Sequence, residues 1–88
     1  MFYHMNLAKK EIHSFQGMEY EVVVYRAEED GHLRGYISAG GFSNRIAEMS
    51  GETAYDMKST DVADPIEFLM NVMKDEIDAG KFPVMKQT

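Results

Sequence analysis

The sequence predicts an α+β domain in two layers, an antiparallel sheet of three to five strands packed by one C-terminal helix. Three observations predict this fold. The first two are an amphipathic helix with clear boundaries near the C-terminus, and β-rich segments separated by turn sequences before it. The third is size, because 88 residues with 44% hydrophobic side chains, five Tyr and five Phe provide one core and no more. We therefore expect a single domain over residues 1–88.

Residues 19–27 and 32–39 are rich in Val, Tyr and Ile, and Asp30-Gly31 between them favours a tight turn, so a β-hairpin is predicted. Even positions of its first strand lie beside odd positions of its second. One face carries the expected core residues Tyr20, Val22, Val24, Leu33, Ile37 and Ala39. The other face carries Glu21, Val23, Tyr25, Arg34, Tyr36 and Ser38. An earlier strand over residues 9–15, turning at Gln16-Gly17, would extend the hairpin to a three-stranded meander.

Residues 40–63 admit two interpretations. In the first, residues 43–49 form a short helix capped by Ser43, and a strand follows over residues 52–58. In the second, which we favour, Ser50-Gly51 is a hairpin turn between two strands. That hairpin would pair Ile46 with Tyr55 and Arg45 with Asp56, and Gly40-Gly41 would join it to the first hairpin.

The C-terminal helix begins at a clear signal. Asp64-Pro65-Ile66-Glu67 combines a capping Asp, a Pro in the first helical position and a Glu in the third. Apolar residues then recur at intervals of three and four, which is typical of a helix with one buried face. They are Ile66, Leu69, Met70, Met73 and Ile77, with Phe68 and Val72 widening the stripe. Gly80 is the expected left-handed residue after the last turn, so the helix is predicted over residues 65–79.

Acidic residues concentrate in the C-terminal half of the chain. The net charge is −6, and residues 46–80 hold nine acids against two bases. Such a surface repels phosphate backbones and anionic membranes and attracts a basic partner. No apolar run approaches the roughly 20 residues of a membrane span, and residues 1–6 lack the features of a signal peptide, so we expect a cytoplasmic protein.

Enzymatic and metal-binding motifs are sparse. The sequence has no cysteine, which excludes disulfides, thiolate zinc sites, iron–sulfur clusters and cysteine nucleophiles. His4, His13 and His32 are too scattered for a histidine metal site, and the carboxylates before the helix lack EF-hand spacing. No serine lies in a nucleophile motif, and no glycine-rich segment carries the Walker lysine. We therefore expect no catalytic residue, no cofactor and no metal.

The face with Tyr25, Arg34 and Tyr36 is a candidate binding surface. Aromatic side chains on an open sheet stack on unpaired bases, and Arg34-Gly35-Tyr36 matches the first three positions of the RNP1 pattern of RNA-recognition domains. Ile37 and Ser38 depart from the next two positions. The alternative is that the two tyrosines form a cross-strand pair covered by the N-terminal segment.

One short stretch resembles a known family. Tyr20-Glu21-Val22-Val23-Val24-Tyr25 followed by Glu29-Asp30-Gly31 is similar to the opening hairpin of HicB-type antitoxins. The family's Pro-rich third-strand segment is missing, and its helix comes earlier than residue 65, so we do not assign the chain to it. The resemblance implies a small acidic protein that neutralises a basic, RNA-cleaving partner.

Elimination of the other classes favours a small acidic non-enzymatic interaction protein, a bacterial or phage inhibitor or adaptor that binds a basic protein partner. Asp75 and Asp78 on the polar side of the helix would attract this partner, and Tyr25, Arg34 and Tyr36 would anchor it. The alternative is a single-stranded nucleic-acid binder that uses the aromatic face. A third reading is a small ligand- or metal-dependent enzyme.

Overall fold

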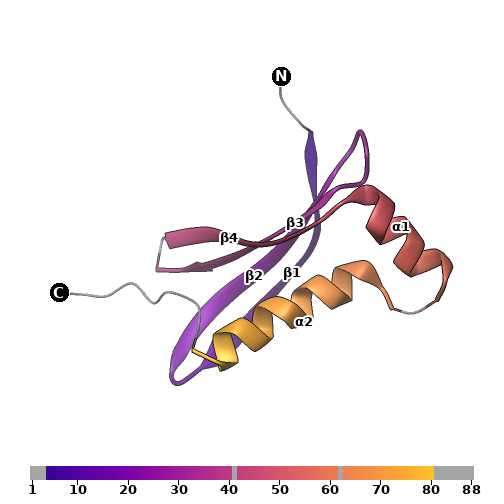
Figure 1. Ribbon diagram of the computed structural model, residues 1–88. Coiled ribbons are helices and arrows are strands. Elements are labelled where there is room, and N and C mark those ends of the chain that lie inside the picture. Colours follow the sequence, from indigo (N-terminus) through magenta and orange to yellow (C-terminus); the bar gives the residue numbers. More distant parts are fainter. Residues whose placement is uncertain (1–3, 41, 62, 81–88) are drawn as a thin grey trace.

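The structure is a computed structural model that describes residues 4–40, 42–61 and 63–80. Four strands are followed by two helices (Figure 1): β1 (Met5–Phe15), β2 (Met18–Ala27), β3 (Leu33–Ala39), β4 (Phe42–Met49), α1 (Gly51–Ser59) and α2 (Pro65–Asp78). The strands form one antiparallel sheet in the order β1-β2-β3-β4, and α2 packs against one of its faces. The predicted two-layer α+β fold is therefore confirmed, with four strands and one more helix than expected.

The strands of the meander are joined by short turns. Phe15 pairs with Met18, and the two residues between them, Gln16 and Gly17, have φ angles of 50° and 79°, as a type I′ turn requires. Between β2 and β3 the last residues paired by Cα are Arg26 and Leu33, which confirms the predicted even-to-odd register. The β3–β4 connection contains Gly40, with φ of 57°, as expected; Gly41 lies outside the described residues.

The core lies between α2 and the face of the sheet predicted to be buried. Tyr20, Val22, Val24, Leu33 and Ile37 contribute from the strands, and Leu69, Met70, Met73 and Ile77 from α2. Gly35 allows the close approach of the helix, because a Cβ there would lie 2.6 Å from Met73 Cε. Phe68 was predicted to widen the buried apolar face of α2, but its side chain is 45% exposed, so the prediction was wrong at this residue.

The start of α2 is confirmed at Asp64. Its carboxylate Oδ1 accepts hydrogen bonds from the backbone N–H groups of Ile66, at 2.9 Å, and Glu67, at 3.4 Å. The helix ends at Asp78, one residue earlier than predicted, and Ala79 is the C-cap. Gly80 adopts the expected positive φ, of 73°.

The favoured interpretation of residues 40–63 was right about a strand before Ser50 and wrong about the hairpin turn and second strand, and the other interpretation was wrong in both of its elements. A strand, β4, precedes a helix, α1, and Ser50 caps that helix by accepting a hydrogen bond from Thr53 N at 3.1 Å. The expected pairing of Arg45 with Asp56 does not form, because Arg45 lies opposite Tyr36. The alternation in residues 53–58 is misleading because burial follows a three-residue interval, with Ala54 and Met57 against the core.

The position of α1 depends on Gly51. A Cβ at this residue would lie 1.7 Å from the carbonyl oxygen of Asp30, in the β2–β3 loop. Only glycine permits this close approach between the first residue of α1 and that loop. The contact directs the chain from the end of β4 back towards α2.

Strand β1 contacts α2 through charged side chains. Glu11 and Lys74 are 2.5 Å apart, Lys9 pairs with Glu67, and His13 Nε2 lies 2.8 Å from Asp78 Oδ1. The hydrogen bond from Lys74, with a further one from Lys9, holds the pKa of Glu11 below its usual range. The hydrogen bond to Glu67 raises the pKa of Lys9. We call these three contacts the β1–α2 ladder.

The core assignment makes a paired prediction on neighbouring residues of α2. Leu69→Ala should lower the free energy of unfolding by about 2–4 kcal/mol, because Leu69 is 3% exposed and its loss leaves a cavity. Phe68→Ala should cost less, because Phe68 is 45% exposed and lies outside the buried cluster. Urea denaturation of both variants measures the difference, and equal losses would show that the helix is rotated from the orientation described.

The ladder predicts a specific sensitivity to acid. A carboxyl whose folded pKa is lowered stabilises the fold above its unfolded pKa, and that contribution disappears as the pH falls through the folded value. Glu11→Gln should therefore reduce stability at pH 7, by about 1 kcal/mol or less for so accessible a pair, and the difference should shrink towards about pH 3. Urea denaturation at both pH values measures this. The control Glu19→Gln, in an exposed residue of β2, should show no such dependence, and a pH-independent deficit at Glu11 would contradict the role of its charge.

Candidate functional site

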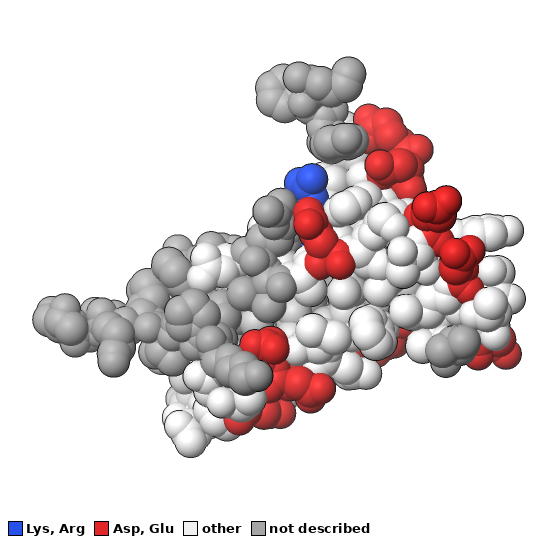
Figure 2. Space-filling model, viewed as in Figure 1, with Lys and Arg blue, Asp and Glu red and all other residues white. Residues whose placement is uncertain are grey.

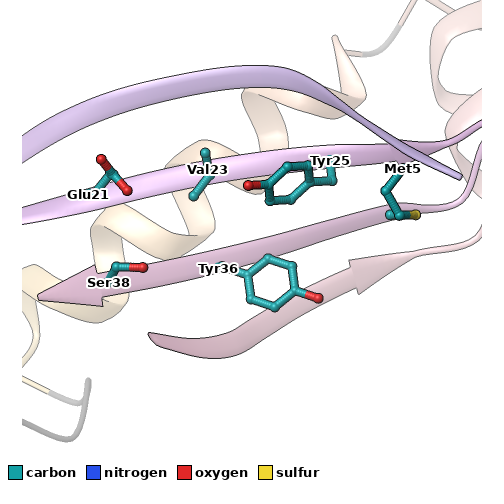
Figure 3. Close-up of a pocket in the computed structure, with 6 residues that line it drawn as sticks. All are labelled: Met5, Glu21, Val23, Tyr25, Tyr36 and Ser38. Atoms are coloured by element: carbon teal, nitrogen blue, oxygen red, sulfur yellow. The ribbon is translucent and has the colours of Figure 1, made fainter. Parts of the chain in front are cut away.

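The sheet face opposite α2 carries two tyrosines in contact (Figure 3). Tyr25 and Tyr36 pack edge to face, with ring centroids 5.7 Å apart and ring planes at 79°. They come from neighbouring strands, where Tyr25 lies opposite Arg34 and Tyr36 lies opposite Val23. The expected cross-strand pair is therefore present; whether the first residues of the chain cover it concerns residues 1–3, outside the described part.

A shallow hollow of about 320 Å³ lies beside this pair. Its lining consists of Met5, Glu21, Val23, Tyr25, Tyr36 and Ser38 (Figure 3). Val23 lies between the Cα partners Lys10 and Tyr36 and is only 6% exposed, although it is on the face away from α2. The hollow offers aromatic and aliphatic contacts with a carboxylate and a hydroxyl at its rim. This lining suits binding rather than acid–base or nucleophilic chemistry.

Among the described residues, two places on this face bring opposite charges together. Lys10 Nζ lies 3.0 Å from Glu21 Oε2. Arg34 Nε lies 3.4 Å from Glu48 Oε2, and His32 Nε2 approaches the same oxygen at 3.3 Å. The cation that we expected beside the tyrosines, Arg34, is thus engaged by a carboxylate of β4.

The structure separates the five expected binding residues into two groups. Tyr25, Arg34 and Tyr36 lie on the open face of the sheet, whereas Asp75 and Asp78 belong to α2 on the opposite side. Asp75 is exposed, but Asp78 contacts His13 in the β1–α2 ladder. One partner surface that contacts Tyr36 therefore does not also contact Asp75.

Among the residues that the structure describes, most of the acidic side chains without an ion pair lie in or beside α1 and α2. Figure 2 shows this side of the molecule, where acidic side chains far outnumber basic ones and gather around α1 and the C-terminal end of α2. Within the described part of the chain, no ion pair forms at Glu52, Asp56, Asp61, Asp75 or Glu76. We call these five residues the acidic surface.

Two exposed aromatic side chains on the same helices were missed by the sequence reasoning. Tyr55 of α1 is 71% exposed, and Phe68 of α2 is the other. Tyr55 was assigned to a strand and Phe68 to the core. A helical assignment of residues 51–59 with Ala54 and Met57 inward would have placed Tyr55 in solvent.

The described residues form neither a metal-binding cluster nor a membrane-spanning helix. The residues that the structure describes contain no group of three or more His, Asp or Glu side chains arranged to hold a metal ion. Asp64, one of the carboxylates before α2, caps that helix instead. Neither helix in the described ranges is long and apolar enough to cross a membrane.

Comparison with known proteins assigns no family. No protein-family model, no curated protein and no solved structure matches the chain. The open face of the sheet and the acidic surface are therefore the features from which a function can be proposed.

Proposed function

We propose that this protein is a small, non-enzymatic interaction protein that binds a basic protein partner through its helical layer. The observation that carries the proposal is the acidic surface, in which Glu52, Asp56 and Asp75 are exposed and lack an ion pair within the described chain. An inhibitor or adaptor of bacterial or phage type, acting in the cytoplasm, is the class that we propose.

The distribution of cations supports this orientation. On the β1 side of α2, the acids Glu67 and Asp78 contact Lys9 and His13. On the α1 side, no ion pair between described residues involves Glu52, Asp56 or Asp61. The negative electrostatic potential of the acidic surface therefore attracts a basic partner to α1 and the outer side of α2. This attraction accelerates association and makes the association rate dependent on salt.

The exposed aromatic side chains supply the affinity that charge alone does not. Tyr55 is flanked on α1 by Glu52 and Asp56, and Phe68 lies on α2. Large aromatic side chains that become buried at an interface commonly dominate its binding energy, whereas rim charges act mainly on the association rate.

Single-stranded nucleic-acid binding is the second candidate, favoured by the pair of Tyr25 and Tyr36 on an open sheet face. Fluorescence anisotropy with labelled single-stranded oligonucleotides tests it directly. The engagement of Arg34 by Glu48 and the net charge of −6 weaken this candidate, because phosphate binding needs available cations.

The first proposal predicts a charge-reversal result. A partner is captured from lysate on the immobilised protein, and its association kinetics are measured at several salt concentrations. Asp75→Lys should slow association by roughly threefold to tenfold at low salt and flatten the salt dependence, because it reverses a charge in the acidic surface.

Glu19→Lys is the matched control. It makes the same change in net charge at an exposed residue of β2 whose strand position is on the open face of the sheet, which α2 does not cover, and should leave the kinetics nearly unchanged. Equal effects of the two variants, or capture of acidic partners only, would contradict the proposal.

A further inference from the structure

We infer that α1 is a locally opening helix, which unfolds and refolds as a unit separate from the sheet and α2 while the rest of the fold stays intact. The inference concerns the isolated chain and does not depend on the proposed function. It follows from the burial, the hydrogen bonds and the charges of α1, which differ from those of α2.

The first argument is burial. α1 lies at the end of the sheet rather than across it (Figure 1), and none of its nine residues is buried. Of its hydrophobic side chains, only Ala54 and Met57 pack against the core, and both are partly exposed. In contrast, α2 buries five residues, among them Leu69 and Met73. A helix of fewer than about 12 residues is marginal in water without tertiary packing, so α1 has a much smaller reserve of stability than α2.

The inward side of α1 is also incompletely packed. Gly51, Ala54, Tyr55 and Lys58 follow one another at intervals of three, one and three residues along one side of the helix, and they line an open hollow of about 350 Å³. The rest of the lining comes from the end of β2, the β2–β3 loop, the start of β3 and the start of α2. Side chains that face such a hollow lose the van der Waals contacts that a packed core would provide, so they hold the helix in place weakly.

The second argument is that no polar side-chain contact in the described part of the chain connects α1 to another element. The hydrogen bonds of residues 50–61 join residues of that segment to one another, such as the bond from Thr60 N to Asp56 O at 3.0 Å. Glu52, Asp56 and Lys58 form no ion pair with a described residue. α2, by comparison, is connected to the sheet by the β1–α2 ladder.

Charge and backbone conformation also act against the closed form. Glu52 and Asp56 are four residues apart on α1, where side chains are neighbours, and like charges at this spacing destabilise a helix. Asp61, just beyond the helix, has φ of 59°, a left-handed conformation that residues other than glycine rarely adopt. Both costs disappear when α1 opens, so both lower the free energy of opening.

The rest of the fold does not need α1. The buried cluster is formed by the strands and α2 and contains no residue of α1. On one side of α1 the chain is anchored at Met49, which pairs with Leu33 at the end of β4. On the other side it is anchored at Asp64, which caps α2. A segment with few buried apolar contacts between two such anchors opens at a free energy below that of global unfolding.

Opening affects the acidic surface, and this consequence alone rests on the proposed function. Glu52 and Asp56 belong to α1, whereas Asp75 and Glu76 belong to α2, so opening divides the surface into two parts. A basic partner that contacts both helices binds the closed form better and therefore raises its population. Its apparent affinity is reduced in proportion to the fraction of chains in which α1 is open.

Native-state amide hydrogen exchange of the full chain, followed by NMR at urea concentrations below the unfolding transition, tests the inference. Relative to their intrinsic rates, the amides of residues 55–59 in α1 should exchange about 100-fold faster than those of residues 69–77 in α2, because they need only local opening. Low urea should leave exchange in α1 nearly unchanged and accelerate it in α2, because local opening exposes little surface.

Removal of the two helix caps separates local from global opening. Asp64→Ala should accelerate exchange in α2 about fivefold and leave α1 unchanged, because it destabilises the open and closed forms of α1 equally. Ser50→Ala is the matched variant at the cap of α1, and it should accelerate exchange in α1 about fivefold, because it destabilises only the closed form. Circular dichroism verifies that each variant is folded.

Three results overturn the inference. Equal protection and equal urea dependence of α1 and α2 would show that α1 opens only when the whole chain unfolds. Equal acceleration of both helices in Asp64→Ala would show the same. Absence of any protection in α1 would show that the helix does not form. The urea series uses the wild-type chain, so it decides the question even where a cap variant does not fold.

Discussion

The packing of the apolar side of α2 on β2 and β3 is the interaction on which the rest of the structure depends. Leu69 and Met73 lie in one buried cluster with Val22, Val24 and Ile37. A meander of four strands has no core of its own, because a single sheet can bury a face only against another layer. The helix supplies that layer, and the opposite face is left open as a consequence.

The two edge strands relate to this core in different ways. β1 contributes charged side chains towards the helix, and its ladder of Lys9, Glu11 and His13 couples the strand to α2 by contacts between charged groups that salt weakens. β4 instead leads directly into α1, whose first residue, Gly51, is close to the β2–β3 loop. The polar edge therefore pairs with acids of α2, whereas Glu52 and Asp56 of α1 form no ion pair with the residues that the structure describes.

Two surfaces with different chemistry result. The helical layer is acidic and carries isolated exposed aromatics such as Tyr55, which suits recognition of a basic partner. The open sheet face carries two ion pairs among its described residues and the pair of Tyr25 and Tyr36, which suits a flat apolar contact.

The sequence by itself determined the elements whose signals are local: α2 between Asp64 and Gly80, the β2–β3 hairpin, and the parity that buries Val22 and Val24. Helix capping, turn residues and the periodic spacing of apolar side chains each depend on a few neighbouring residues. They can therefore be recognised from the sequence alone. Only the tertiary structure decided the order of strand and helix in residues 42–59, because the contact of Gly51 with Asp30 joins segments that lie far apart in sequence. It also decided that the tyrosines and the acids occupy opposite sides, since the side of the sheet that α2 covers is set by long-range packing.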